Sequence, residues 1–160
     1  MESPIEQFYR GRGVFITGGS GFLGKVLIEK LLRSCPGIDA VYVLIRPKRG
    51  VKVDDRLEEI VRSQLFDVLR CERPAALAKL VAVSGDISLP DGMGICAADL
   101  QTLKSKVSVV FHSAARVRFD QNVQEPTEMN VEGTRQLLLL CRQLSHLEAI
   151  KLLNRQYSLN

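Results

Sequence analysis

The glycine-rich stretch VFITGGSGFLGKVLIEKLL, Val14 to Leu32, constrains the fold of this chain more than any other feature. An apolar, β-branched run precedes the glycines and predicts a buried strand. After the glycines, apolar residues recur at helical spacing until Pro36-Gly37, which predicts an amphipathic helix. Because glycine has no Cβ, such a turn lets a phosphate approach the backbone, and the helix N-terminus supplies free N–H groups. The stretch therefore predicts a strand, a phosphate-binding turn and a helix.

Three phosphate-binding patterns overlap in this turn. Gly19, Gly21 and Gly24 spell the dinucleotide fingerprint G-x-G-x-x-G, and Gly18 begins a G-x-x-G-x-x-G variant of it. The turn also begins a Walker A loop, G-x-x-x-x-G-K, but Val26 stands where that loop needs a Ser or Thr to ligate magnesium. The pattern favours a dinucleotide over a nucleoside triphosphate. A glycine-rich turn that binds nothing is the simplest alternative.

Apolar strands and amphipathic helices alternate along the rest of the chain. Besides GVFIT, buried strands are predicted at AVYVLI, KLVAVS and Val107–Phe111. Helices are predicted at PAALAKL, DLQTLKS, Val131–Leu144 and Asp54–Arg70, the last capped by Asp54 or Asp55. Such alternation predicts one α/β domain with a doubly wound, Rossmann-like parallel sheet.

Polar or glycine-rich residues follow each predicted strand. Because parallel strands end at the same edge of a sheet, the glycine turn, Arg46, Asp86 and the HSAAR segment from His112 are expected to converge there. Arg46 stands about where NAD-binding sites carry Asp or Glu, and a guanidinium grips a 2′-phosphate that a carboxylate would repel. The position favours NADP over NAD. The simpler alternative is a solvated basic loop.

Composition argues against several other classes of function. The 160-residue chain has a net charge of +4, and its densest basic cluster, Arg46–Lys52, has no interleaved aromatics, so nucleic-acid binding is not favoured. The 4 cysteines are scattered, so neither a metal site nor a disulfide framework is predicted. No apolar run is long enough for a membrane span, and MESPIEQFYR is unlike a signal peptide. An intracellular protein is expected, with no targeting signal in this chain.

With these features in place, the sequence resembles the N-terminal part of the fatty acyl-CoA reductases, a family of extended short-chain dehydrogenases. The resemblance covers most of Phe8–Ala149 and rests on the order and spacing of TGGSGFLGKVL, VLIRPKRG, GDI, VVFHSAARVRFD and NVEGTRQLL. It implies an NADPH-dependent oxidoreductase of lipid metabolism that converts a fatty acyl-CoA to a fatty alcohol through an aldehyde. It also implies association with peroxisomes or the endoplasmic reticulum.

The resemblance assigns roles to individual residues. The pyrophosphate would be held by Thr17, Gly18, Gly19, Ser20, Gly21, Phe22, Leu23 and Gly24. Arg46 would bind the 2′-phosphate, and Asp86 and Ile87 would lie along the adenine. The nicotinamide side would be lined by Ser113, Ala114 and Ala115, and a proton relay would involve Asn130. Simpler alternatives are an Asx turn at Asp86, a hydrogen-bonding role for His112 and a helix N-cap at Asn130.

The end of the chain departs from the family pattern. The family's Tyr-x-x-x-Lys pair, whose tyrosine donates a proton, is absent, because Tyr9, Tyr42 and Tyr157 have no Lys four positions later. Arg116 also stands where the family has a small residue. The segment IKLLNRQYSLN matches neither strand alternation nor a good amphipathic helix. A C-terminally truncated NADP-binding domain at residues 1–149 is therefore expected, lacking one strand and followed by a divergent tail at 150–160.

Two hypotheses from different classes remain open. In the first, the chain is the N-terminal fragment of a fatty acyl-CoA reductase and is itself inactive. In the second, it is a non-catalytic NADP-binding module. A sugar-nucleotide epimerase of the same superfamily is disfavoured, because Arg46 argues against the NAD that such enzymes use.

Overall fold

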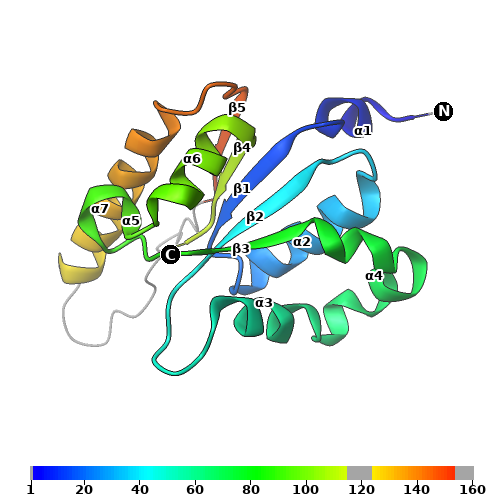
Figure 1. The fold of residues 1–160 in the computed structure, drawn as a ribbon, viewed down its shortest axis with the longest axis horizontal. Helices are drawn as coiled ribbons and strands as arrows, with labels where there is room; N and C mark the ends of the chain where they lie inside the picture. Colours follow the sequence, from blue (N-terminus) through cyan, green and yellow to red (C-terminus); the bar gives the residue numbers. More distant parts are fainter. Residues whose placement is uncertain (1, 115–123, 154–160) are drawn as a thin grey trace, which may run out of the picture.

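A parallel β-sheet with helices on both faces forms the framework of the molecule (Figure 1). The computed structural model describes residues 2–114 and 124–153, with only the backbone described for 124–129. The elements, with η for 3-10 helices, are α1 (Pro4–Tyr9), β1 (Gly13–Thr17), α2 (Phe22–Ser34), β2 (Ala40–Ile45), α3 (Val53–Val61), η1 (Gln64–Phe66), α4 (Asp67–Glu72), η2 (Pro74–Lys79), β3 (Leu80–Ser84), α5 (Pro90–Met93), α6 (Ala97–Lys106), β4 (Val107–His112), α7 (Gln124–Cys141) and β5 (Ala149–Leu152).

The strands in these ranges run parallel in the order β3-β2-β1-β4-β5. From β1 the chain moves outward through β2 to β3, and then crosses to the other side of β1 to form β4 and β5. This order confirms the predicted doubly wound, Rossmann-like fold. Because the connections switch direction between β1 and β4, ligands of such sheets bind at the carboxyl ends of these two strands.

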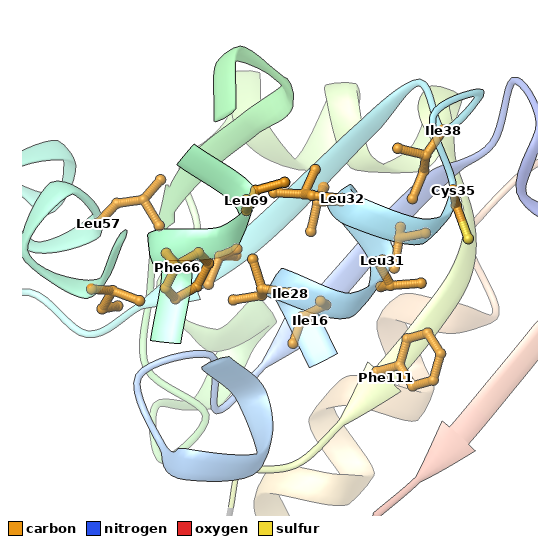
Figure 2. Close-up of a cluster of buried hydrophobic side chains, with 14 of the residues drawn as sticks. Ile16, Ile28, Leu31, Leu32, Cys35, Ile38, Leu57, Phe66, Leu69 and Phe111 are labelled. Carbon is orange, nitrogen blue, oxygen red and sulfur yellow. The ribbon is translucent and has the colours of Figure 1, made fainter. Parts of the chain in front are cut away.

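Alternate residues of the central strands pack into two separate hydrophobic clusters. Ile16 lies in the cluster that includes Ile28 of α2 and Phe66 of η1 (Figure 2). Phe15 faces the other way and joins a cluster that includes Leu137 of α7. Figure 1 shows α2, α3 and α4 on one side of the sheet and α5, α6 and α7 on the other. Both faces are covered, which explains why the central strands β1, β2 and β4 read as continuous apolar runs.

The prediction of a single helix over Asp54–Arg70 is wrong. The segment breaks after α3, and η1 and α4 follow, so that Phe66 and Leu69 are fully buried while Val68 points to solvent. At the break, the guanidinium of Arg70 donates to the carbonyl of Val61. The predicted cap is also wrong, because Lys52 occupies the N-cap position of α3. The short helix predicted at PAALAKL is present as the 3-10 helix η2.

The expectation that the end of the chain supplies no strand is also wrong. Strand β5 pairs in parallel with β4 in a register that matches Val109 with Ala149. The register continues to the carboxyl end of β4, where the Leu153 N–H donates to the His112 carbonyl over 2.8 Å. Pairing at a sheet edge depends on backbone hydrogen bonds, so the exposed Lys151 is compatible with it. The edge position therefore explains why the sequence shows no alternation.

The cysteines carry no disulfide: Cys35 and Cys141 are buried, and Cys71 and Cys96 are exposed. Burial raises the pKa of the Cys141 thiol to about 11, so this side chain is a packing group. Within residues 2–114 and 124–153, no helix is long and apolar enough to cross a membrane. Among the side chains described, those of residues 2–114 and 130–153, no three His, Cys, Asp or Glu groups gather where they could hold a metal ion.

Candidate cofactor-binding site

The glycine turn between β1 and α2 needs glycine at three positions. Gly18 has φ +75°, and a Cβ there would lie 2.5 Å from the Ala114 nitrogen. A Cβ on Gly19 would overlap the side chain of Val43, and one on Gly24 would overlap the Gly18 carbonyl. Gly21 is less restricted, since it has φ −75° and its Cβ would lie 3.3 Å from the Gly18 carbonyl oxygen. Close packing around the turn therefore explains the glycines at positions 18, 19 and 24 better than any single glycine pattern does.

The N-terminus of α2 leaves amide donors for an anion. Gly21 is the N-cap and provides no side-chain cap, and the first helical hydrogen bond runs from the Lys25 N–H to the Gly21 carbonyl, 3.0 Å. The first-turn amides before Lys25 therefore have no acceptor within the helix. Phe22 and Leu23 are exposed, at 77% and 57%, so the turn opens to solvent. Uncapped amides in an exposed, glycine-rich turn fit a phosphate group.

The carboxyl end of β4 is fixed against this turn. The Ser113 N–H and hydroxyl both donate to the Thr17 carbonyl, at 3.1 and 2.8 Å. Ala114 lies directly beside Gly18, whereas Ala115 and Arg116 lie outside the described residues. At the switch point, the backbone after β4 is therefore hydrogen-bonded to the end of β1 and packed against the glycine turn.

The buried imidazole of His112 links the end of β1 to α7. His112 Nδ1 lies 2.6 Å from the Thr17 hydroxyl, and Nε2 lies 3.2 Å from the hydroxyl of Thr134. The Thr134 hydroxyl in turn donates to the Asn130 carbonyl, 2.8 Å. Burial lowers the pKa of His112, which favours the neutral ring. The simpler, hydrogen-bonding role is therefore confirmed for His112, and Asn130 is no N-cap because it lies inside α7.

The depressed pKa of His112 predicts a pH-dependent stability. Between its folded pKa and the ordinary value of 6.5, the unfolded chain binds more protons than the folded chain. His112 therefore contributes stability that is complete above pH 6.5 and is lost as the pH falls toward the folded pKa, by at most about 1.4 kcal/mol per pH unit. Urea unfolding at about pH 7.5 and pH 5.5 should show a larger loss for the native chain than for His112→Gln. An equal loss of stability in the native and His112→Gln chains would contradict this contribution of His112.

A charged pair lies at the ends of β2 and β3. Arg46 Nε contacts Asp86 Oδ2 at 2.8 Å, and the Arg46 side chain is 66% exposed. Arg56 of α3 donates to the Arg46 carbonyl, so the residue is held by its backbone and by its guanidinium. Asp86 Oδ1 accepts from the Ser88 N–H and hydroxyl, at 2.9 and 2.8 Å. The Asx turn is therefore present, and it leaves the other carboxylate oxygen for Arg46.

The neighbouring loop brings α7 close to the predicted adenine side. A Cβ on Gly133 would lie 3.1 Å from Ile87 Cδ1, so glycine permits this close approach. The backbone from Asp91 to Gly94 stays at positive φ, which includes the non-glycine residues Asp91 and Met93. The Met93 carbonyl accepts from the Asp86 N–H, 2.8 Å, so this left-handed turn fixes the backbone of Asp86. Such strain persists only where surrounding contacts determine it.

The predicted convergence on one edge of the sheet is confirmed for the described residues. Gly18, Arg46, Asp86 and Ala114 follow the carboxyl ends of β1, β2, β3 and β4, in a sheet whose strands are parallel. Sequence reasoning missed Arg56 and Thr134. Arg56 carries no motif, and Thr134 gave only a weak signal as a hydroxyl inside an otherwise apolar helix.

A turn of this geometry at the switch point of a 3-2-1-4-5 sheet defines a Rossmann-like domain that binds a nicotinamide dinucleotide. The chain belongs to the NAD-binding family described as Male sterility protein, which matches residues 16–154.

Relatives and solved structures agree with this assignment. A mouse protein named fatty acyl-CoA reductase 1 is 42% identical over 154 residues, which are 96% of this chain and 30% of the relative. The Xenopus laevis protein of the same name is 45% identical over 144 residues, 90% of this chain and 28% of the relative. The reductase domain of a non-ribosomal peptide synthetase from Mycobacterium tuberculosis is 28% identical, with a TM-score of 0.70 over 88% of this chain and 32% of that one. This chain thus spans about 30% of the relatives' length.

Proposed function

We propose that this chain binds NADPH in preference to NADH at the carboxyl edge of its sheet. Arg46 carries the proposal, because its exposed guanidinium stands at the end of β2, where the ribose of a dinucleotide lies in this fold. Asp86 Oδ2 contacts Nε of that guanidinium, and the Arg46 side chain is 66% exposed, so a 2′-phosphate could reach it from solvent. The uncapped amides of α2 would hold the pyrophosphate.

Arg46→Ala is expected to remove the cofactor preference. A hydrogen bond to a charged group contributes about 1.5–3 kcal/mol, so NADPH affinity should fall by about tenfold to a hundredfold. NADH lacks the 2′-phosphate and should bind the variant almost as it binds the native chain. The measurement is the dissociation constant of each cofactor by calorimetry or by nicotinamide fluorescence.

Arg62→Ala supplies the matched control for the loss of one positive charge. Arg62 lies at the end of α3, is 77% exposed and pairs with Glu58 over 2.9 Å. It should leave both dissociation constants nearly unchanged. Equal losses of NADPH and NADH affinity in Arg46→Ala would contradict the proposal, as would an equal loss of NADPH affinity in Arg62→Ala.

We propose further that the whole protein is an NADPH-dependent reductase of fatty acyl-CoA. The support is the name shared by relatives at about 40% identity, together with the cofactor geometry above. Ser113, Ala114 and Ala115 would then lie on the nicotinamide side, Asp86 and Ile87 along the adenine, and Asn130 would serve the proton relay. Bound NADPH would supply a hydride, and the glycine turn with Ser113 and Ala114 at the end of β4 would hold and orient it.

A further inference from the structure

His112 connects three elements that meet at the carboxyl edge of the sheet. Its ring lies between Thr17, the last residue of β1, and Thr134 of α7, and only 7% of the residue is exposed. Its carbonyl accepts from the Leu153 N–H beyond β5, 2.8 Å. Thr17 is fully buried and directly precedes Gly18. The imidazole therefore links the residue that directly precedes the glycine turn to α7.

The direction of these hydrogen bonds follows from the number of protons. The Thr134 hydroxyl has one proton and donates it to the Asn130 carbonyl, 2.8 Å. Thr134 must then accept from His112, so Nε2 carries the ring proton. In the neutral ring Nδ1 is an acceptor, and the Thr17 hydroxyl donates to it over 2.6 Å. Each donor and acceptor in this series of hydrogen bonds, from the Thr17 hydroxyl through His112 and Thr134 to the Asn130 carbonyl, thus has one defined role.

We propose that His112 is a positioning residue that fixes the position of the glycine turn relative to α7. The packing of α7 then influences the affinity of the turn for its cofactor. The proposal rests on the dinucleotide site proposed above and adds a residue that does not touch the cofactor. Thr17 has its carbonyl bound by Ser113 and its hydroxyl bound by His112. Any shift of α7 that moves Thr134 therefore changes the hydrogen bonding of the residue that enters the turn.

Thr134→Val tests this link from outside the turn. One neutral hydrogen bond contributes about 0.5–1.5 kcal/mol, so the variant should bind NADPH roughly three- to tenfold more weakly. In a His112→Asn background, which no longer reaches Thr134, the same substitution should have no further effect. Thr102→Val is the matched control, because Thr102 of α6 also donates to a carbonyl one helical turn back, Ala98, 3.1 Å. It should leave the dissociation constant unchanged.

Two measurements on the chain without cofactor keep the proposal testable if NADPH does not bind. The ¹⁵N shifts of the imidazole should show a protonated Nε2 in the native chain, and the ring should lose this single tautomer in Thr134→Val. In a double-mutant cycle, Thr17→Val and Thr134→Val together should cost less stability than the sum of the two single losses.

Three results would overturn the proposal. The first is a native ring protonated at Nδ1, and the second is strict additivity of Thr17→Val and Thr134→Val. The third is an unchanged NADPH affinity in a folded Thr134→Val chain. Failure of the native chain to bind NADPH would count against the proposed function, and the tautomer and the cycle would still decide the role of His112.

Discussion

Gly18→Ala is expected to abolish NADPH binding and to destabilise the chain. Alanine at φ +75° has a strain of about 1–2 kcal/mol, and its Cβ would lie 2.5 Å from backbone atoms of Ser113 and Ala114 that cannot rotate away. Relief of that overlap separates Ser113 from Thr17, so the total loss of stability should be roughly 2–4 kcal/mol. A displaced turn also loses at least two charge-assisted bonds to the pyrophosphate, which lowers affinity about a hundredfold or more.

Gly50→Ala separates the two causes of this loss. Gly50 has φ +76°, close to that of Gly18, but nothing lies within 4 Å of its Cβ position. Gly50→Ala should therefore show the backbone strain alone, with little loss of NADPH affinity. Circular dichroism and urea unfolding check that the Gly18→Ala chain is folded where binding is measured. Normal affinity in a folded Gly18→Ala chain would contradict the role of the turn.

The 160-residue chain itself is expected to show no reduction of a long-chain acyl-CoA by NADPH. Hydride transfer to a thioester and then to an aldehyde places negative charge on oxygen twice, and each time a proton donor is needed. General acid catalysis contributes about 10²–10⁴-fold, and the sequence has no Tyr followed by Lys four positions later. His112 does not supply the donor, because both ring nitrogens are occupied by threonine hydroxyls and burial lowers its pKa.

Product analysis after incubation with NADPH and a long-chain acyl-CoA tests this expectation. The Gly18→Ala chain provides the background for contaminating activity. Aldehyde or alcohol above that background would contradict the expectation and would require a proton donor elsewhere in the chain. Bound NADPH without product would support a cofactor-binding part whose catalysis depends on other parts of the protein.

The central part of the fold could be predicted from sequence because its signals are local. Strands β1, β2 and β4 are apolar runs that are buried almost throughout, and the edge strand β3 is also a short apolar run bounded by turns. Strand β5 could not be predicted, since an edge strand is held by backbone pairing and leaves Ile150 and Leu152 partly exposed. The break after α3 was missed because Val68 continues the apolar period although its side chain faces solvent.

The site was predictable where a motif marks the end of a strand. The glycine turn, Arg46 and Asp86 follow strands directly, and the parallel topology brings them to one edge. The contacts among them could not be predicted, because Arg46 and Asp86 are 40 positions apart and their contact depends on the β2–β3 pairing. The link from Thr17 through His112 to Thr134 was missed for the same reason. The β1–β4 pairing places the Thr17 hydroxyl beside His112, and α7 brings the Thr134 hydroxyl to the other ring nitrogen.

The most direct test of the cofactor site is a titration of the ¹⁵N-labelled chain with NADPH and, separately, with NADH, followed by backbone amide shifts. With both cofactors, the account predicts changes at Gly18–Gly24 and at Ser113 and Ala114. Changes at Arg46 and Asp86 should be much larger with NADPH, because only NADPH carries the 2′-phosphate. Changes confined to another face of the sheet, or identical changes at Arg46 with both cofactors, would contradict the account.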